Sequence, residues 1–521
     1  MKKHLKHVVV WTLVLAMVVL TGCGGGNNTG GTGTEPNETP EKSNEFVYAA
    51  GTEPTTFDPH FITDVNTARA AMQIFETLVT WNEDSKIVPL LAESWTTSED
   101  NKTWTFKLKE GVKFHDGAPF NAEAVKYNFE RILSPEVASP RKSSADMVEK
   151  VEVVSEYEVN ITTKEPAGAF LAQLTNYNLS MLSPKAAEEL GKEFGQKPSG
   201  TGPLMLDVWE PGKTLTYTKF DGYWGTKSTI DKLTYKTVPE DSSRVMMLKT
   251  GDADVISGLP PIQVEELKSD KNVDVVIAPG YRTIYIGTNM KKDLFKDVKV
   301  RQAINYAIDK KSIIDNVLRG LSIYPAGVES PAIMFAATDL TPYDYNPEKA
   351  KQLLAEAGYP NGFKTTLHTP EGRYPMDKQV AEVVQSMLKE VGIDAEIIVL
   401  DWGAYQEATT KGDVTNLFLL GKGSPAGDPD YDLTLSFGTG GKMNNSFYSN
   451  TEVDKLLADQ KTSVDQEYRA KVLHEIQEKI HNDSPWAVLY YENQTMGKRA
   501  DVDGFKVQPN EILDLRYLTR K

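Results

Sequence analysis

The sequence of 521 residues contains one cysteine, Cys23. A lone thiol has no partner within the chain, which excludes an internal disulfide framework and any zinc site built from several cysteines. After Leu20 no run approaches the roughly 20 consecutive apolar residues that a membrane-spanning helix needs. We therefore expect a fold that its hydrophobic core alone stabilises.

Basic residues are in deficit. Lysine and arginine number 57 against 73 aspartates and glutamates, which gives a formal charge of −16. Nucleic-acid binding needs a basic face that neutralises phosphates. Electrostatic binding to an anionic membrane surface likewise needs an excess of lysine and arginine. The composition argues against both partners, although a local site can still oppose the net charge and bind an anion.

Catalytic and metal-binding motifs are also scarce. Neither Gly-x-Ser-x-Gly nor His-Glu-x-x-His occurs. The segment Gly212-Lys213-Thr214 ends like a phosphate loop, but Asp207 stands where the first glycine belongs. His474 and His481 are seven residues apart, too far to share an ion without a third ligand. We expect no enzyme, no cofactor and no metal site.

The N-terminus carries a targeting pattern. Lys2, Lys3 and Lys6 precede an uncharged apolar run over residues 8–20. As a helix this run spans about 20 Å, short of a ~30 Å hydrocarbon core, so it indicates an export signal rather than a membrane span. The segment Leu20-Thr21-Gly22-Cys23 resembles the bacterial lipoprotein box, which implies cleavage before Cys23 and diacylation of its thiol. The alternative is an ordinary secretory signal with an incidental cysteine.

A glycine-, threonine- and asparagine-rich segment follows, without a large apolar residue. We predict a lipoprotein signal peptide over 1–22 and a tether over 23–44, long enough to hold a folded part on the order of 25 Å from a membrane. The remaining chain, about 500 residues after Cys23, is long enough for two or three lobes.

Strand and helix patterns alternate irregularly beyond the tether. Residues 46–50 read as a strand, and Trp104, Phe106 and Leu108 alternate with polar residues as in a half-buried strand. Asn121 is placed to cap a helix. Separate strands are predicted over 273–277 and 284–286, and the chain becomes helix-rich after residue 299. This mixture indicates an α/β protein.

An ordered series of motifs covers nearly the whole of the chain after the tether. It closely resembles the signature of the peptide- and nickel-type solute-binding proteins of bacterial ABC importers, family 5. The motifs are Leu91-Ala92-Glu93-Ser94-Trp95, residues 104–117, Asn121-Ala122-Glu123, Gly200-Thr201-Gly202-Pro203, Trp209-Glu210-Pro211-Gly212, Tyr223-Trp224-Gly225, Arg301-Gln302-Ala303-Ile304, residues 357–362, Phe447-Tyr448-Ser449-Asn450 and Asp483-Ser484-Pro485-Trp486.

The resemblance implies a type II periplasmic-binding-protein-like α/β fold, with two main lobes, a hinge and a small inserted lobe. Lobe I is expected over 45–80, 200–279 and 490–521, lobe II over 81–199, and lobe III over 280–489. The ligand is expected in a cleft between lobes I and III that closes around it.

Three ligand contacts are expected after residue 370. Arg373, followed by Tyr374, lies in a loop where dipeptide-binding relatives use an arginine to hold the ligand's carboxylate, although the register is shifted. The alternative is a solvated loop arginine. Trp402 matches a family tryptophan that lines the pocket. The alternative interpretation is that Trp402 is an ordinary core residue without a ligand contact.

Two further contacts are expected from the irregular loop over 421–431, Asp428 and Tyr431. Peptide-binding relatives keep an aspartate here for the ligand's α-amino group. In the dipeptide binders it lies three residues before the Asp-Pro-Asp motif, where this chain has Pro425. Asp428 is the candidate replacement, and the alternative is that it caps its own turn. In this loop the sequence is most similar to the glutathione-binding branch.

The resemblance thus implies a lipid-anchored, extracytoplasmic substrate-binding protein on the outer face of the cell membrane. It would act as a monomer, capture a peptide or glutathione, deliver it to the permease and ATPase of an ABC importer, and change no covalent bond. The alternatives are the same fold binding a nickel chelate, an opine or a sugar oligomer, and an exported hydrolase.

Replacing the single thiol tests the predicted anchor. We expect Cys23→Ala to leave the protein without lipid and uncleaved at residue 22, because diacylation requires the thiol. Metabolic labelling with a radioactive fatty acid and the mass of the purified protein measure this outcome. Persistent diacylation of the variant would refute the lipoprotein box.

Overall fold

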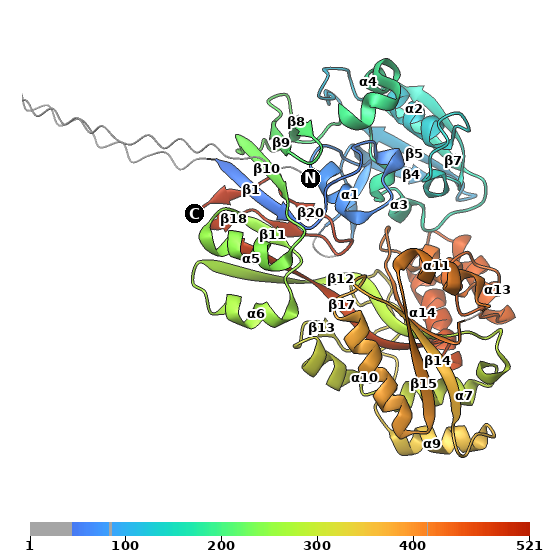
Figure 1. Cartoon of the computed structure of the whole chain (residues 1–521). Helices are drawn as coiled ribbons and strands as arrows, with labels where there is room; N and C mark the ends of the chain where they lie inside the picture. The colour runs from blue at the N-terminus through green and yellow to red at the C-terminus, as the bar shows by residue number, and fades with distance from the viewer. Residues whose placement is uncertain (1–43, 83–85, 414) are drawn as a thin grey trace, which may run out of the picture. The chain divides into compact units, whose positions relative to one another are not determined.

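Two long strands organise the part of the chain that the computed structural model describes, residues 44–82, 86–413 and 415–521. β12 (Val273–Thr288) and β17 (Trp486–Arg499) pair antiparallel along most of their length. They stand in the middle of an eleven-stranded sheet, in which ten strands have the neighbour order β15-β14-β16-β12-β17-β11-β1-β10-β9-β8 and β13 (Ser322–Ile323) pairs with β17 beside this path (Figure 1). The predicted signal peptide, Cys23 and the tether up to residue 43 lie outside the described residues.

β12 differs from the sequence-based expectation of two short strands. One strand covers both predicted stretches, and its pairing with β17 slips between Pro279 and Thr283. Proline has no N–H to donate to a ladder, so a bulge here costs the sheet little. The prediction of two strands was wrong because the polar and glycine residues of the bulge read as a break.

The end of the sheet that is formed mainly by strands from the first half of the chain packs on a hydrophobic core around Tyr48, Phe57, Phe75 and Tyr217. Its strands, with β1 confirming the strand predicted over 46–50, are β1 (Glu45–Ala50), β8 (Leu204–Glu210), β9 (Thr214–Lys219), β10 (Lys232–Thr237) and β11 (Val255–Ser257). The helices here are α1 (Val65–Ala71), α5 (Asp241–Thr250) and α6 (Pro261–Lys268). The chain returns to this region with β18 (Val502–Asp503), β19 (Lys506–Val507), β20 (Leu513–Asp514) and β21 (Thr519–Arg520).

A separate antiparallel sheet of four strands, in the order β4-β5-β7-β6, forms between residues 92 and 163. Trp104, Phe106 and Leu108 are buried on one face, as their alternation predicted. Asn121 accepts a hydrogen bond from Ala124 N at 3.1 Å and caps α2, which confirms its predicted role. The elements are β2 (Val79–Trp81), β3 (Ile87–Pro89), β4 (Ala92–Thr97), β5 (Thr103–Leu108), β6 (Val148–Ser155), β7 (Glu158–Thr163), α2 (Ala122–Leu133), α3 (Phe170–Gln173) and α4 (Pro184–Leu190).

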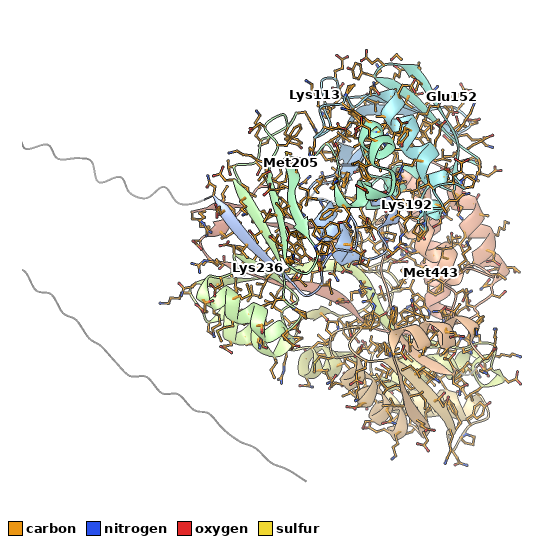
Figure 2. All side chains as sticks on the ribbon, turned by 45° about the horizontal axis from the view of Figure 1, so that its top comes forward. Lys113, Glu152, Lys192, Met205, Lys236 and Met443 are labelled. Carbon is orange, nitrogen blue, oxygen red and sulfur yellow. The ribbon has the colours of Figure 1, made fainter. Side chains whose placement is uncertain are left out.

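Helices dominate the described chain after residue 297, as predicted. The strands β13 (Ser322–Ile323), β14 (Phe363–Pro370), β15 (Ile393–Leu400) and β16 (Leu417–Lys422) extend the large sheet. Figure 1 shows α9 and α10 beside β14 and β15, and Figure 2 marks the two sheets by Lys236 on β10 and Glu152 on β6. The helices are α7 (Val298–Ala307), α8 (Lys310–Ser312), α9 (Pro347–Glu356), α10 (Asp377–Glu390), α11 (Trp402–Lys411), α12 (Pro429–Phe437), α13 (Thr451–Lys461) and α14 (Gln466–Asp483). No helix in the described ranges is both long enough and apolar enough to cross a bilayer.

One lysine is buried in this helical part. The Lys310 side chain is 3% exposed, and its Nζ donates to Tyr343 O at 2.7 Å. Burial lowers the pKa of Lys310 to about 7, although the nearby Asp344 carboxylate opposes the shift. The folded protein therefore binds this proton far more weakly than the unfolded chain does, where the pKa of a lysine is about 10.4.

Lys310 makes the stability of the fold depend on pH. Between pH 7 and about 10 the unfolded chain holds the Lys310 proton and the folded chain does not, so this group makes the free energy of unfolding rise with pH. From pH 7 to 9 we expect a rise on the order of 2 kcal/mol that Lys310→Met abolishes. Urea denaturation of both proteins at the two pH values measures it. Lys311→Met, at the exposed neighbouring position, should keep the wild-type dependence, and an unchanged dependence in Lys310→Met would contradict the assignment.

Candidate functional site

The β12 bulge directs an arginine toward β17 and the carboxyl-terminal segment. Gly280 lies so close to β17 that a Cβ atom there would sit 2.9 Å from Glu492 O, so glycine is needed at this approach. Two residues later, Arg282 Nε lies 3.0 Å from Glu492 Oε2, and the same guanidinium pairs with Glu511. One arginine thus joins β12, β17 and the segment that carries Glu511.

Glu511 also binds an arginine from the other end of the chain. Arg69, on α1, donates from Nε to Glu511 O at 2.7 Å and pairs with its carboxylate at 3.4 Å. Glu511 has φ of +71°, which is uncommon for a residue with a side chain. Gln508 N donates to Ile512 O at 2.8 Å and Glu511 N donates to Gln508 O at 2.9 Å, and these two hydrogen bonds close the tight turn around it. This turn places one carboxylate between two arginines.

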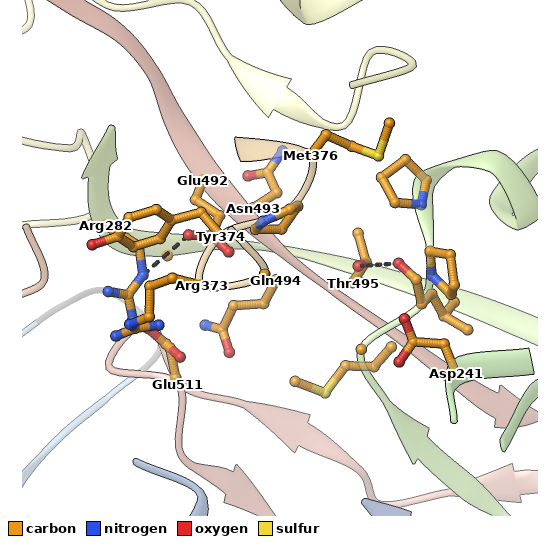
Figure 3. A pocket seen from close by; sticks show the side chains of 18 of the residues that line it. Asp241, Arg282, Arg373, Tyr374, Met376, Glu492, Asn493, Gln494, Thr495 and Glu511 are labelled. Carbon is orange, nitrogen blue, oxygen red and sulfur yellow. Dashed lines mark hydrogen bonds and ion pairs between the residues drawn. The ribbon is translucent and has the colours of Figure 1, made fainter. Parts of the chain in front are cut away.

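These groups line a cavity of about 440 Å³. Figure 3 shows Arg282, Arg373 and Glu511 gathered at one end, with Thr495 and Asp241 at the other. The volume lies within the range of small-molecule sites. We call this cavity the arginine pocket and define it by Arg69, Arg282, Arg373, Tyr374, Glu492, Gln494 and Glu511 among its lining residues.

Arg373 occupies a loop that one carboxylate holds in place. Asp377 accepts backbone hydrogen bonds from Gly372, Arg373 and Tyr374 at 3.1, 2.8 and 3.0 Å. The Arg373 side chain is exposed, and within the described chain its guanidinium takes part in no hydrogen bond or ion pair. It lies 5.0 Å from the ring of Tyr374 and 5.1 Å from that of Trp402. All five of its N–H donors are therefore available to a ligand.

Trp402 supports this arginine from outside the pocket. It is half-buried at the start of α11, stacks on Tyr405 at 5.8 Å and meets the edge of Tyr374 at 6.3 Å. It is not one of the residues that line the arginine pocket. The structure therefore places Trp402 behind Arg373, where a stacked aromatic face fixes the plane of the guanidinium.

The arginine pocket carries an excess of positive charge. Arg69, Arg282 and Arg373 oppose Glu492 and Glu511, while Asp241 at the far end pairs with Arg244 outside the cluster. Burial acts to raise the pKa of Glu511, but Arg282 and Arg69 outweigh it and hold that pKa below its ordinary value. Burial raises the pKa of Glu492, and Arg282 only partly offsets it. The cluster therefore suits a ligand with one more negative than positive group.

Residues 86–444 match the model of the middle region of the bacterial extracellular solute-binding proteins, family 5. The chain belongs to this family. The glutathione-binding protein GsiB of Salmonella typhi is 34% identical over 475 residues, which cover 89% of this chain and 92% of that protein.

Solved structures agree on the fold of this family 5 protein. HbpA2 from Haemophilus parasuis superposes with a TM-score of 0.84 at 28% identity, covering 92% of this chain and 100% of that one. DppA from Helicobacter pylori, in complex with the peptide STSA, has a TM-score of 0.76 at 31% identity over 91% of this chain and 98% of that one. The predicted fold class, a two-lobed type II binding protein of mixed α/β structure, is confirmed.

Asp428 lies away from the arginine pocket. Its carboxylate accepts two hydrogen bonds from Arg469 at 2.8 Å each, and one from Asp430 N at 2.9 Å that caps α12. Both side chains of the ion pair are almost fully buried, beside a second cavity of about 690 Å³ lined by Trp95, Trp104 and Phe335. The capping alternative for Asp428 is therefore present, and its charge is already neutralised.

Tyr431 lines neither of these two cavities. It is half-buried on α12, where burial raises the pKa of its hydroxyl, Asp432 adds to the shift and Arg141 opposes it. Of the five expected ligand contacts, the structure brings Arg373 and Tyr374 into one pocket, with Trp402 behind them. It places Asp428 and Tyr431 elsewhere. No group of three or more histidine, cysteine, aspartate or glutamate residues in the described ranges is arranged to hold a metal ion.

Sequence reasoning missed Arg69, Arg282, Glu492 and Glu511. Arg69 and Glu511 are 442 residues apart, and no spacing rule joins them. Two signals were present: Arg282 and Glu492 are charged residues beside the apolar stretches 284–286 and 486–491 of their strands. A charge in a buried strand needs a partner, so each of these residues predicts an oppositely charged residue nearby.

The buried pair of Asp428 and Arg469 gives a stability test. Asp428→Ala leaves an unpaired guanidinium in the interior, and we expect it to lower the free energy of unfolding by about 3–5 kcal/mol. Urea denaturation measures the loss. The double variant Asp428→Leu with Arg469→Met should recover much of it, because no buried charge remains. A loss below about 1 kcal/mol in the single variant would show that Asp428 is free for another role.

Proposed function

We propose that this protein is the lipid-anchored, extracytoplasmic substrate-binding protein of an ABC importer and that it captures a peptide, with glutathione the best-matched ligand. It would act as a monomer on the outer face of the cell membrane. It would deliver its ligand to the permease and ATPase complex unchanged, as a binding protein and not an enzyme. Support comes from the family, from the ligands of its relatives and from the charges of the arginine pocket.

The free guanidinium of Arg373 is the observation that carries the proposal. Arginine binds carboxylates through two parallel charge-assisted hydrogen bonds, and Arg373 has no partner for them within the described chain. Every free peptide ends in a carboxylate. A dipeptide with neutral side chains carries one positive and one negative group, whereas glutathione carries two carboxylates and one ammonium, a net charge of about −1 near neutral pH. The excess positive charge of the pocket therefore favours glutathione.

The pocket residues come from both of the predicted main lobes. Arg69, Glu492 and Glu511 belong to the range expected for lobe I, and Arg282, Arg373 and Tyr374 to the range expected for lobe III. We propose that the arginine pocket is part of the cleft between them and that ligand contacts made only in the closed form shift the equilibrium toward closure. The permease would then recognise the closed form.

Titration calorimetry with Arg373→Ala tests the proposal. We expect the wild-type protein to bind glutathione and the variant to bind it roughly 10- to 100-fold more weakly, because one charge-assisted carboxylate contact is lost. Lys378→Ala is the matched control: this lysine is five residues away, pairs with Glu371 and does not line the pocket. Its affinity should equal that of the wild-type protein.

The ligand panel also separates the alternatives. It contains glutathione, trialanine, a nickel–histidine chelate, an opine and a sugar oligomer. Binding of one of the last three with no binding of either peptide would replace the peptide proposal. Equal affinity of Arg373→Ala and wild-type protein for glutathione would remove Arg373 from the site, and turnover of any ligand would contradict a pure binding role.

A further inference from the structure

Two oxygens in the arginine pocket, both on residues of β17, accept no hydrogen bond within the described chain. Gln494 is 9% exposed, and its Nε2 donates to Gln508 O at 2.8 Å, which fixes the orientation of the amide and leaves Oε1 as an acceptor. Within the described chain, neither Gln494 Oε1 nor Glu492 Oε2 accepts a hydrogen bond, although Glu492 Oε2 forms an ion pair with Arg282. Residues two apart on a strand face the same side, so the two oxygens belong to one surface.

A third acceptor lies on the segment that Gln494 contacts. The turn between Gln508 and Ile512 presents the Glu511 carboxylate, and Arg282 joins Glu511 to Glu492. Figure 3 shows the side chains of Glu492, Gln494 and Glu511 in the same part of the pocket. The side chains of Glu492 and Glu511 are 23% and 21% exposed, so they are shielded from solvent but open to the cavity they line.

The chemistry of these acceptors selects their ligand group. A buried acceptor that receives no hydrogen bond, such as Gln494 Oε1, is unfavourable, so a ligand that supplies donors gains affinity here. A primary ammonium has three N–H donors, no acceptor and a positive charge. Amides and hydroxyls supply fewer donors and have acceptors of their own. They also carry no positive charge that could pair with the two carboxylates. An ammonium is therefore the group that best fits Glu492, Gln494 and Glu511.

Asp428, the residue that family resemblance suggests for this role, lies outside the arginine pocket. Its two carboxylate oxygens already accept hydrogen bonds from Arg469 and from the α12 backbone, and it does not line the arginine pocket. Releasing it would leave the fully buried Arg469 unpaired.

We propose that the α-amino group of the ligand binds Glu492, Gln494 and Glu511, in the same pocket in which Arg373 binds a carboxylate. This subsite rests on the proposed peptide-binding function and refines it. The ligand class is an amine with at least one carboxylate, and a blocked amino terminus excludes tight binding.

Paired ligands that differ only at the amino group test the subsite. Titration calorimetry of the whole extracytoplasmic protein uses glutathione, N-acetylglutathione, trialanine and N-acetyltrialanine. For the wild-type protein we expect at least one free amine to bind roughly 10- to 100-fold more tightly than its acetylated form. Glu492→Gln should reduce this ratio to about threefold or less, by weakening only the free amine.

Further variants keep the test decisive. Glu265→Gln removes an exposed carboxylate on α6 that pairs with Lys268 and does not line the pocket, and it should keep the wild-type ratio. Thermal unfolding checks that each variant folds. If Glu492→Gln does not fold, Gln494→Leu takes its place, since it removes an acceptor without a charge, and it should also lower the ratio.

The outcomes separate the subsite from the function. Free and acetylated ligands that bind the wild-type protein equally would overturn the subsite and leave the peptide-binding proposal standing. A ratio that persists in Glu492→Gln and collapses in Asp428→Asn would assign the amine to Asp428 and overturn the subsite. A wild-type protein that binds none of the four ligands would remove both proposals.

Discussion

The pocket depends on one guanidinium, that of Arg282, between two carboxylates. Charges that leave water are costly unless each has a partner of opposite sign, and Arg69, Glu511, Arg282 and Glu492 form a chain of ion pairs. Their side chains are between 12% and 23% exposed, so solvent screens them weakly. The bulge that directs Arg282 toward Glu492 and Glu511 therefore determines where this cluster of partly buried charges lies.

The ion-pair chain also shows how an acidic protein can contain a locally positive pocket. The net charge of −16 belongs to the whole chain, whereas the pocket gathers three arginines against two glutamates. Because salt screens the interactions of partly buried charges less than those at the surface, the local excess, and not the net charge, determines the electrostatic field inside the pocket. Arg373 differs from the other two arginines in that aromatic rings, and not carboxylates, hold it, so its hydrogen-bonding capacity remains for a ligand.

Local patterns predicted the elements well. The alternation around Trp104, the cap at Asn121 and the first strand were read from neighbouring residues, because their causes are local. The ordered motifs predicted the fold class, and the loop of Arg373 followed from them. The union of the two predicted stretches into the single strand β12 could not be predicted from their own residues. It depends on pairing with β17 on both sides of the bulge, and β17 lies more than 200 residues later in the sequence. The ion pair of Asp428 could not be read from its loop for the same reason: its partner Arg469 is 41 residues away, on a helix whose sequence pattern indicates only its apolar face.

Contacts between distant segments assemble the rest of the site. Arg69 precedes its partner by 442 residues and Arg282 by 229, so neither pair leaves a trace in any short window of sequence. This separation has a consequence for synthesis. While the chain is being made, both arginines emerge long before residue 511, and they lack their shared counter-ion until that residue has been added. A nascent or truncated protein would therefore hold an over-positive, unfinished pocket, and ligand capture would begin only once the final turn had folded against the two arginines.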